Sequence, residues 1–251
     1  MADLAASASL PAPRDRRLLA IMVALGLIAV ATLLIVPFET ILPASLRVPR
    51  IALLIQPAVI TLACAVLGWW TGPRTGLGAP ALSALVAGQD WLRPLRHGLP
   101  AVLLCAAVTA LILVIYGVAT QHILTAMPQL DVPLLARLGY GGVGEEIIAR
   151  WGLLTGFMAL ALRLGASSGR AFWLANSTAA LLFALGHFGV LFAMMPDPPI
   201  WLMSAVVAGN FVPAMLFGWL YRRYGIESAM LAHGGAHALF CGAAAAGLVG
   251  W

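Results

Sequence analysis

Residues 18–36 read LLAIMVALGLIAVATLLIV, a run without any charge in which Thr32 is the only polar side chain. An α-helix rises about 1.5 Å per residue, so nearly twenty such residues span a hydrocarbon core about 30 Å thick. The apolar part of a cleaved signal peptide is shorter, roughly 7–15 residues, and no convincing cleavage site follows this run. We therefore expect residues 18–36 to form a retained transmembrane helix.

The rest of the chain is also rich in apolar residues and poor in charged ones. Only 9% of its 251 residues are charged and 62% are hydrophobic, whereas soluble domains carry about 25% charged residues. Further apolar runs lie at about 51–70, 98–118, 134–162, 171–195, 200–221 and 227–250. We expect an all-α fold, a polytopic transmembrane helical bundle of about seven spans, or eight if 134–162 is split. Residues 1–17 are predicted to be a cytoplasmic tail and 18–250 a single bundle, with the catalytic core at about 134–250 and the active site in a membrane-embedded cavity.

The arginines predict the orientation of this bundle, because positive charge marks the cytoplasmic loops of membrane proteins. With the N-terminus inside, the loops at 119–133 and 195–199 fall outside, and neither contains a basic residue. An odd count of seven spans places the C-terminus outside. Arg47 and Arg50 are the exceptions on the outer side. The arginines that fall inside are Arg74, Arg93, Arg96, Arg163, Arg170, Arg222 and Arg223.

The net charge of +5 is explained by this topology, so we expect the lipid bilayer, and no nucleic acid, as a partner. All fourteen basic residues are arginine. Together with the high alanine content, this indicates a GC-rich bacterial genome. The predicted location is the cell inner or plasma membrane, crossed several times, with a cytoplasmic N-terminus.

Ionisable side chains lie inside three of the predicted spans. The stretch Gly144–Trp151 reads GEEIIARW and contributes two carboxylates and a guanidinium. Charged groups within spans are rare, usually face the protein interior, and are functional candidates by default. We expect them to converge on one internal site. The candidates are Glu145, Glu146, Arg150, His187, His233 and His237.

Helical spacing separates the roles of the two adjacent carboxylates. Glu146 and Arg150 are four residues apart, so they share a face and can form an ion pair. Glu145 points about 100° away from Glu146 and is left to face a cavity. His233 and His237 are also four apart, a spacing that suits two metal ligands on one helix. The plainer alternative for Glu146 and Arg150 is a buried ion pair that only fixes helix packing.

Three motifs, in order, resemble a known family. They are Glu145-Glu146-x-x-x-Arg150, Phe183-x-x-x-His187 and His233-x-x-x-His237, and the stretch GWLYRR at 218–223 adds to them. Over about residues 140–240 the chain resembles the CPBP family of intramembrane proteases. That family includes the CAAX prenyl endopeptidases and bacterial abortive-infection and bacteriocin-immunity proteins. One departure bears on the chemistry: the family commonly has Asn where this chain has His237.

The resemblance implies a protease that hydrolyses a peptide bond of a membrane-associated protein or peptide. Glu145 would be the general base, activating water with His187, while His233 and His237 would stabilise the oxyanion or bind the water. Glu146 and Arg150 would hold Glu145 in place. Glu145, His187, His233 and His237 could form a zinc site, or the site could work without metal.

Two other classes of function stay open at this point. One is a non-catalytic membrane protein that confers immunity or binds a lipid or peptide. The other is a proton- or metal-coupled transporter, which the absence of an internal sequence repeat makes less favoured.

Overall fold

The computed structural model describes residues 14–41, 49–124 and 131–249, and all regular secondary structure in these ranges is helical. This confirms the all-α prediction. Among the described residues, five helical segments are long and apolar enough to cross a membrane, and the chain is a multi-pass membrane protein. They are Arg16–Ile35, Arg50–Thr75, Leu92–Ile123, Ser168–Met194 and Ile200–Tyr224. The expected count of seven or eight spans is not confirmed, because the two segments that hold most of the candidate site residues are not among the five.

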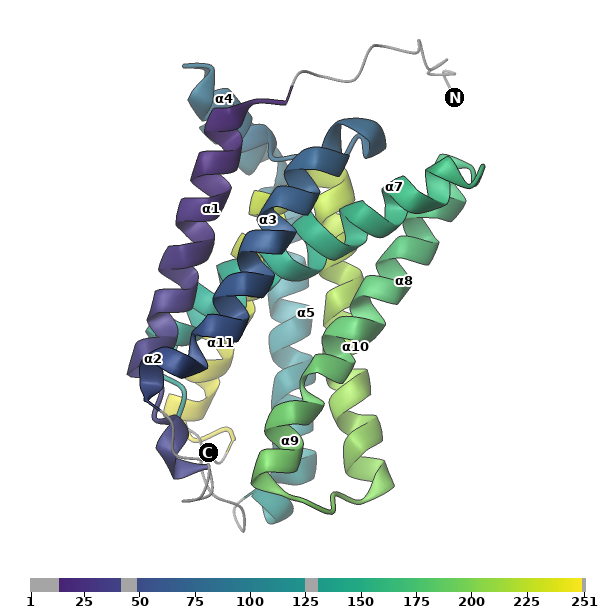
Figure 1. Ribbon diagram of the computed structural model, residues 1–251. Helices are drawn as coiled ribbons and strands as arrows, with labels where there is room; N and C mark the ends of the chain where they lie inside the picture. Colours follow the sequence, from purple (N-terminus) through teal and green to yellow (C-terminus); the bar gives the residue numbers. More distant parts are fainter. Residues whose placement is uncertain (1–13, 42–48, 125–130, 250–251) are drawn as a thin grey trace.

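The helices follow one another up and down the bundle (Figure 1). Helix α1 is followed by the short 3₁₀ turns η1 and η2, while η4 and η5 are π-helical turns that lie between α6 and α7. The elements of the first half are α1 (Arg16–Ala31), η1 (Thr32–Ile35), η2 (Phe38–Thr40), α2 (Arg50–Leu53), α3 (Ile55–Thr75), α4 (Pro80–Val86) and α5 (Leu92–Leu124). Those of the second half are α6 (Leu134–Ala136), η4 (Arg137–Gly144), η5 (Ile147–Leu154), α7 (Thr155–Arg163), α8 (Ser168–Gly186), α9 (Phe188–Met194), α10 (Ile200–Tyr224) and α11 (Ile226–Ala245).

The segment that carries the two adjacent carboxylates lies inside the bundle rather than at its rim. Its η4 part packs against α1 and α11, and its η5 part packs against α3 and α8. Helix α11, which carries the two histidines, packs mainly against α5 and η4. The first half of the chain therefore encloses the motif segments, although it contributes none of the motifs itself.

The segment that carries Glu145, Glu146 and Arg150 was expected to be α-helical, but in the structure it is not a continuous α-helix. The Glu145 N–H donates to the Tyr140 carbonyl, and the Thr155 N–H donates to the Arg150 carbonyl, each five residues earlier. Such π-turns are rare and occur frequently at functional sites. The helices also extend beyond the apolar runs at about 51–70 and 98–118, since α3 continues to Thr75 and α5 already begins at Leu92.

Glycines allow this segment to approach its neighbours closely. A Cβ on Gly152 would lie 2.8 Å from the Cα of Cys64 on α3, and a Cβ on Gly142 would lie 3.0 Å from the Cα of Gly234 on α11. Close approach of backbones is a common way to join helices in membranes, where burial of apolar surface gives little driving force. Trp151 adds a directed contact, because its indole N–H donates to the Ala65 carbonyl at 3.0 Å.

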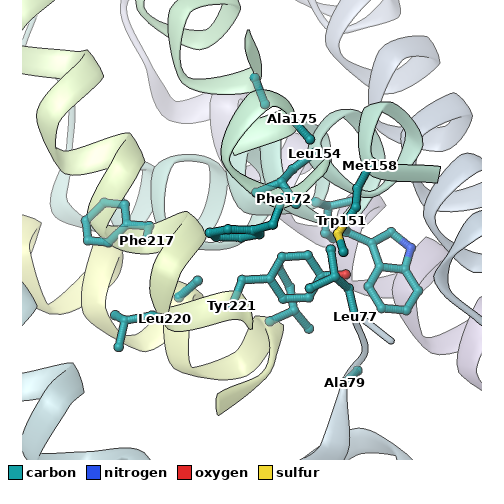
Figure 2. Close-up of a cluster of buried hydrophobic side chains, with 14 of the residues drawn as sticks. Leu77, Ala79, Trp151, Leu154, Met158, Phe172, Ala175, Phe217, Leu220 and Tyr221 are labelled. Atoms are coloured by element: carbon teal, nitrogen blue, oxygen red, sulfur yellow. The ribbon is translucent and has the colours of Figure 1, made fainter. Parts of the chain in front are cut away.

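Trp151 belongs to a cluster of buried apolar side chains (Figure 2). It draws on η5, α7, α8, α10 and the connection between α3 and α4. Figure 2 shows how the rings of Phe172, Phe217 and Tyr221 lie among the smaller side chains. The labelled members are Leu77, Ala79, Trp151, Leu154, Met158, Phe172, Ala175, Phe217, Leu220 and Tyr221.

Charged side chains that join neighbouring helices lie at one end of the bundle. The Arg14 guanidinium lies over the rings of Trp69 and Trp70, at 5.9 and 6.0 Å, which joins the start of α1 to α3. At the same end the Leu82 N–H donates to the Glu227 carboxylate at 2.8 Å, which joins α4 to the first turn of α11. The ends of α5, α7, α8 and α10 that carry the predicted inner arginines also lie here (Figure 1).

Arg50, one of the two arginines predicted on the outer side, has its charge balanced by a nearby carboxylate. It forms an ion pair and hydrogen bond with Glu39 at the opposite end of the bundle. A backbone hydrogen bond at Glu39, together with this contact, holds the pKa of the Glu39 carboxyl below its usual value. Arg47 and most of the predicted N-terminal tail lie outside the described residues.

The distribution of arginines predicts that the loop around Asp197 faces outward and the turn at Ser167 faces the cytoplasm. With a membrane-impermeant maleimide, Asp197→Cys should be labelled in intact cells, and Ser167→Cys only after permeabilisation. The reverse pattern would show that the bundle is inserted the other way round.

Replacing Gly152 by alanine should destabilise the bundle, because the new methyl group meets backbone atoms of α3. Overpacking of this kind costs about 1–3 kcal/mol. Gly169→Ala is the matched control, since a Cβ there meets nothing within 4 Å. Thermal unfolding in detergent should show a lower midpoint for Gly152→Ala alone, and equal midpoints would contradict the close approach.

Candidate active site

The centre of the site is the carboxylate of Glu146. It is fully buried and lies 3.0 Å from the Arg150 guanidinium, measured from Oε1 to Nη1, so the ion pair expected from the spacing is present. The same Oε1 lies 2.8 Å from Nδ1 of His233 on α11. Because an ionised carboxylate only accepts hydrogen bonds, we assign the proton of this contact to Nδ1. Sequence reasoning missed this second bond of Glu146.

Aromatic rings enclose the buried guanidinium. The Cζ atom of Arg150 lies 5.0 Å from the ring centre of Phe183 on α8 and 5.5 Å from that of Phe217 on α10. Phe217 also stacks on His233, with ring centres 4.8 Å apart. Ring faces attract a cation, so they offset part of the loss of hydration. In the sequence, Phe183 was noted only as the first residue of the Phe183-x-x-x-His187 motif. Nothing in the sequence distinguishes Phe217 from the other apolar residues of its span.

Glu145 is placed differently from its neighbour. Its side chain keeps 22% of its surface exposed, and its Oε2 lies 3.9 Å from Nε2 of His233. It is also close enough to His187 and His233 to interact with both electrostatically. The two adjacent carboxylates therefore approach opposite nitrogens of one imidazole ring, one as a hydrogen-bonded anchor and the other across a wider gap.

His187 lies at the break between α8 and α9. Its Nδ1 is 2.9 Å from the Phe183 carbonyl, so Nδ1 carries the proton and Nε2 of the neutral ring is an acceptor. The edge of the Phe183 ring packs against it, with ring centres 4.9 Å apart. Within the described parts of the chain, His187 forms no hydrogen bond or ion pair with any of the other five candidates.

His237 stacks on His233 with ring centres 4.9 Å apart and an angle of 25° between the rings. Its Nε2 faces Gly141 of η4, where a Cβ would lie only 2.9 Å away. Its Nδ1 is buried and has no hydrogen-bond partner among the described residues. The absence of a side chain at Gly141 is what makes room for this ring.

The described residues do not fit a zinc site formed by Glu145, His187, His233 and His237. Zinc ligands lie about 2.0–2.2 Å from the ion and converge on it from several sides. No group of three or more His, Cys, Asp or Glu side chains within residues 14–41, 49–124 and 131–249 is placed to hold a metal ion. His233 has only Nε2 left for a ligand, because its Nδ1 is bonded to Glu146.

Two shallow apolar grooves, of about 490 and 450 Å³, lie along α8, α9 and α10. They share Val207 and Phe211 of α10, and the larger one is also lined by Phe188, which directly follows His187. None of the six candidate site residues lines either groove. The cavity expected around the site stays a prediction.

Residues 128–239 match the family model described as type II CAAX prenyl endopeptidase Rce1-like. The matched part of the chain is thus similar to the Rce1-like family. The match covers all six candidate residues and confirms the resemblance to CPBP proteases, a family of hydrolases. No curated protein and no solved structure gives a significant match to the chain.

The two carboxylates should differ sharply in their effect on stability. Glu146→Gln removes the ion-pair partner of the buried Arg150 guanidinium, a change that costs about 3–5 kcal/mol. Glu145→Gln is the matched control, because Glu145 is partly exposed and, among the described residues, forms no ion pair with Arg150. Thermal unfolding of both purified variants should show a large loss for Glu146→Gln only. A larger loss for Glu145→Gln would contradict the assignment.

Proposed function

We propose that this Rce1-like chain is an intramembrane endopeptidase that hydrolyses a peptide bond of a membrane-associated substrate, with Glu145 as the general base. One observation carries the proposal. The partly exposed Glu145 carboxylate faces Nε2 of His233 at 3.9 Å, while Glu146 holds the opposite side of that ring at 2.8 Å. The match to the Rce1-like family model supports the reaction class.

The gap between Glu145 and His233 suits one water molecule. A separation of 3.9 Å is too long for a direct hydrogen bond. Two hydrogen bonds of about 2.8 Å, meeting at one oxygen at roughly a right angle, span about 4 Å. A water that donates to Oε2 of Glu145 and to Nε2 of His233 turns its lone pairs toward a substrate carbonyl. The protonated Nδ1 of His233 keeps Nε2 as the acceptor that this requires.

The proposed reaction then follows general acid–base catalysis. Glu145 takes a proton as the water oxygen bonds to the carbonyl carbon, and the carbonyl oxygen becomes an oxyanion. The protonated Glu145 gives that proton to the amide nitrogen as the C–N bond breaks, which releases one new carboxyl and one new amine. His187, whose Nε2 is also an acceptor, would take the place of His233 as second acceptor for the water while it turns toward the carbonyl, and His237 would donate to the oxyanion.

The substrate would approach through the lipid. The larger groove is lined in part by Phe188, the residue after His187, and its lining is almost entirely apolar. An apolar segment of a membrane-associated peptide suits such a surface. The described contacts do not favour the transporter or the purely binding alternative.

Glu145→Gln should lower peptide hydrolysis by about 10²–10⁴-fold, the usual contribution of a general base. Purified protein in lipid nanodiscs would be assayed on a fluorogenic prenylated CAAX peptide. Membrane peptides from cells with active or Glu145→Gln protein would be compared in parallel by mass spectrometry. Asp197→Asn, a change at an exposed carboxylate, is the control and should be fully active. Wild-type turnover by Glu145→Gln would refute the general-base assignment.

His237→Asn separates a metal-free mechanism from a zinc mechanism. Asn keeps a hydrogen-bond donor but is a poor zinc ligand, so without metal the variant should keep much of its activity, and chelators should not inhibit. Turnover and elemental analysis would be measured together for wild type and variant. Stoichiometric zinc that disappears with activity in the variant would show a metalloenzyme.

A further inference from the structure

The stretch Gly218–Arg223 has no role in the proposed catalysis, yet it contains a buried hydroxyl that leads to the site. Tyr221 on α10 is 1% exposed, and its hydroxyl lies 2.9 Å from Oγ1 of Thr155. Oγ1 of Thr155 in turn lies 3.0 Å from the carbonyl oxygen of Arg150. Thr155 is fully buried as well. The two hydroxyls thus connect α10 to the backbone of the residue that pairs with Glu146.

The direction of these hydrogen bonds follows from counting protons. A threonine hydroxyl has one proton, and a carbonyl oxygen only accepts. Thr155 therefore donates to the Arg150 carbonyl, and Tyr221 must donate to Thr155. The resulting chain has one orientation, from Tyr221 through Thr155 to Arg150.

We propose that Thr155 and Tyr221 are positioning residues for the catalytic pair, an inference that rests on the proposed function. They fix the backbone of Arg150, whose guanidinium holds Glu146, whose carboxylate holds His233. The separation between Nε2 of His233 and Glu145 is therefore set partly from α10.

The backbone geometry explains why this carbonyl needs support. Thr155 is the residue at which η5 ends and α7 begins, and its N–H also donates to the Arg150 carbonyl across a π-turn. The carbonyl thus receives both donors of Thr155, which hold the last π-turn in place. Helix α10 is itself a firm support. Asn176 of α8 donates to the Met215 carbonyl at 3.2 Å and occupies the space that a side chain at position 218 would fill.

The test uses substitutions that remove one hydroxyl at a time and preserve the packing of the side chains. Thr155→Val and Tyr221→Phe should each lower kcat per folded molecule by about tenfold, with KM changed less than about twofold, because substrate contacts are untouched. Thr155→Ser keeps the hydroxyl and should restore wild-type kcat. The double variant should be no slower than Thr155→Val, since Tyr221 acts only through Thr155. Tyr224→Phe, on the same helix, is the matched control, because the Tyr224 hydroxyl forms no hydrogen bond with the described residues.

A second readout separates this inference from the proposed function. The imidazole ¹⁵N signals of His233, assigned with His233→Asn, should shift in Thr155→Val and Tyr221→Phe and stay in place in Tyr224→Phe. If wild type hydrolyses nothing, the proposed function fails, and these shifts alone decide the positioning role. Unchanged kcat and unchanged ¹⁵N signals in Thr155→Val would overturn the inference, as would additive losses in the double variant.

Discussion

The arrangement of the site depends on one buried carboxylate that serves two partners. Oε1 of Glu146 binds the Arg150 guanidinium at 3.0 Å and Nδ1 of His233 at 2.8 Å. Neither charge would be tolerated alone in a lipid-embedded interior, since a buried charge without its partner is strongly destabilising. The ion pair stabilises the motif segment, and the bond to His233 joins that segment to α11. The stabilising contact and the one that orients His233 therefore share a single atom.

Two adjacent glutamates acquire different properties because the backbone turns between them. Glu146 points to the arginine and the aromatic rings of Phe183 and Phe217, whereas Glu145 keeps 22% of its side-chain surface exposed. The π-turns on either side of the pair are held by backbone contacts at Gly142 and Gly152 and by the bond from Trp151 to Ala65. Helices without motifs, α1, α3 and α5, thus form the scaffold that gives the motif helices their geometry.

Much of this could be predicted from local patterns. Runs of apolar residues indicated the helices, and the spacing of four residues predicted the pairing of Glu146 with Arg150. What local patterns lack is information about distant partners. The contact of Glu146 with His233 joins residues 87 positions apart, and Phe217 looks like any other apolar residue of a span. The π-turns escaped prediction because they arise where glycines let α3 and α11 approach, which an α-helical period does not reveal.

The orientation of the His233 ring is the most direct test of the central claim, that Glu146 anchors this ring so that its other nitrogen can serve the water beside Glu145. Imidazole ¹⁵N spectroscopy of selectively labelled protein in lipid, with the signal assigned through His233→Asn, reports which nitrogen carries the proton. The account predicts a proton on Nδ1 and none on Nε2 at neutral pH. A proton on Nε2 would contradict it, because that nitrogen could then accept no hydrogen bond from the attacking water.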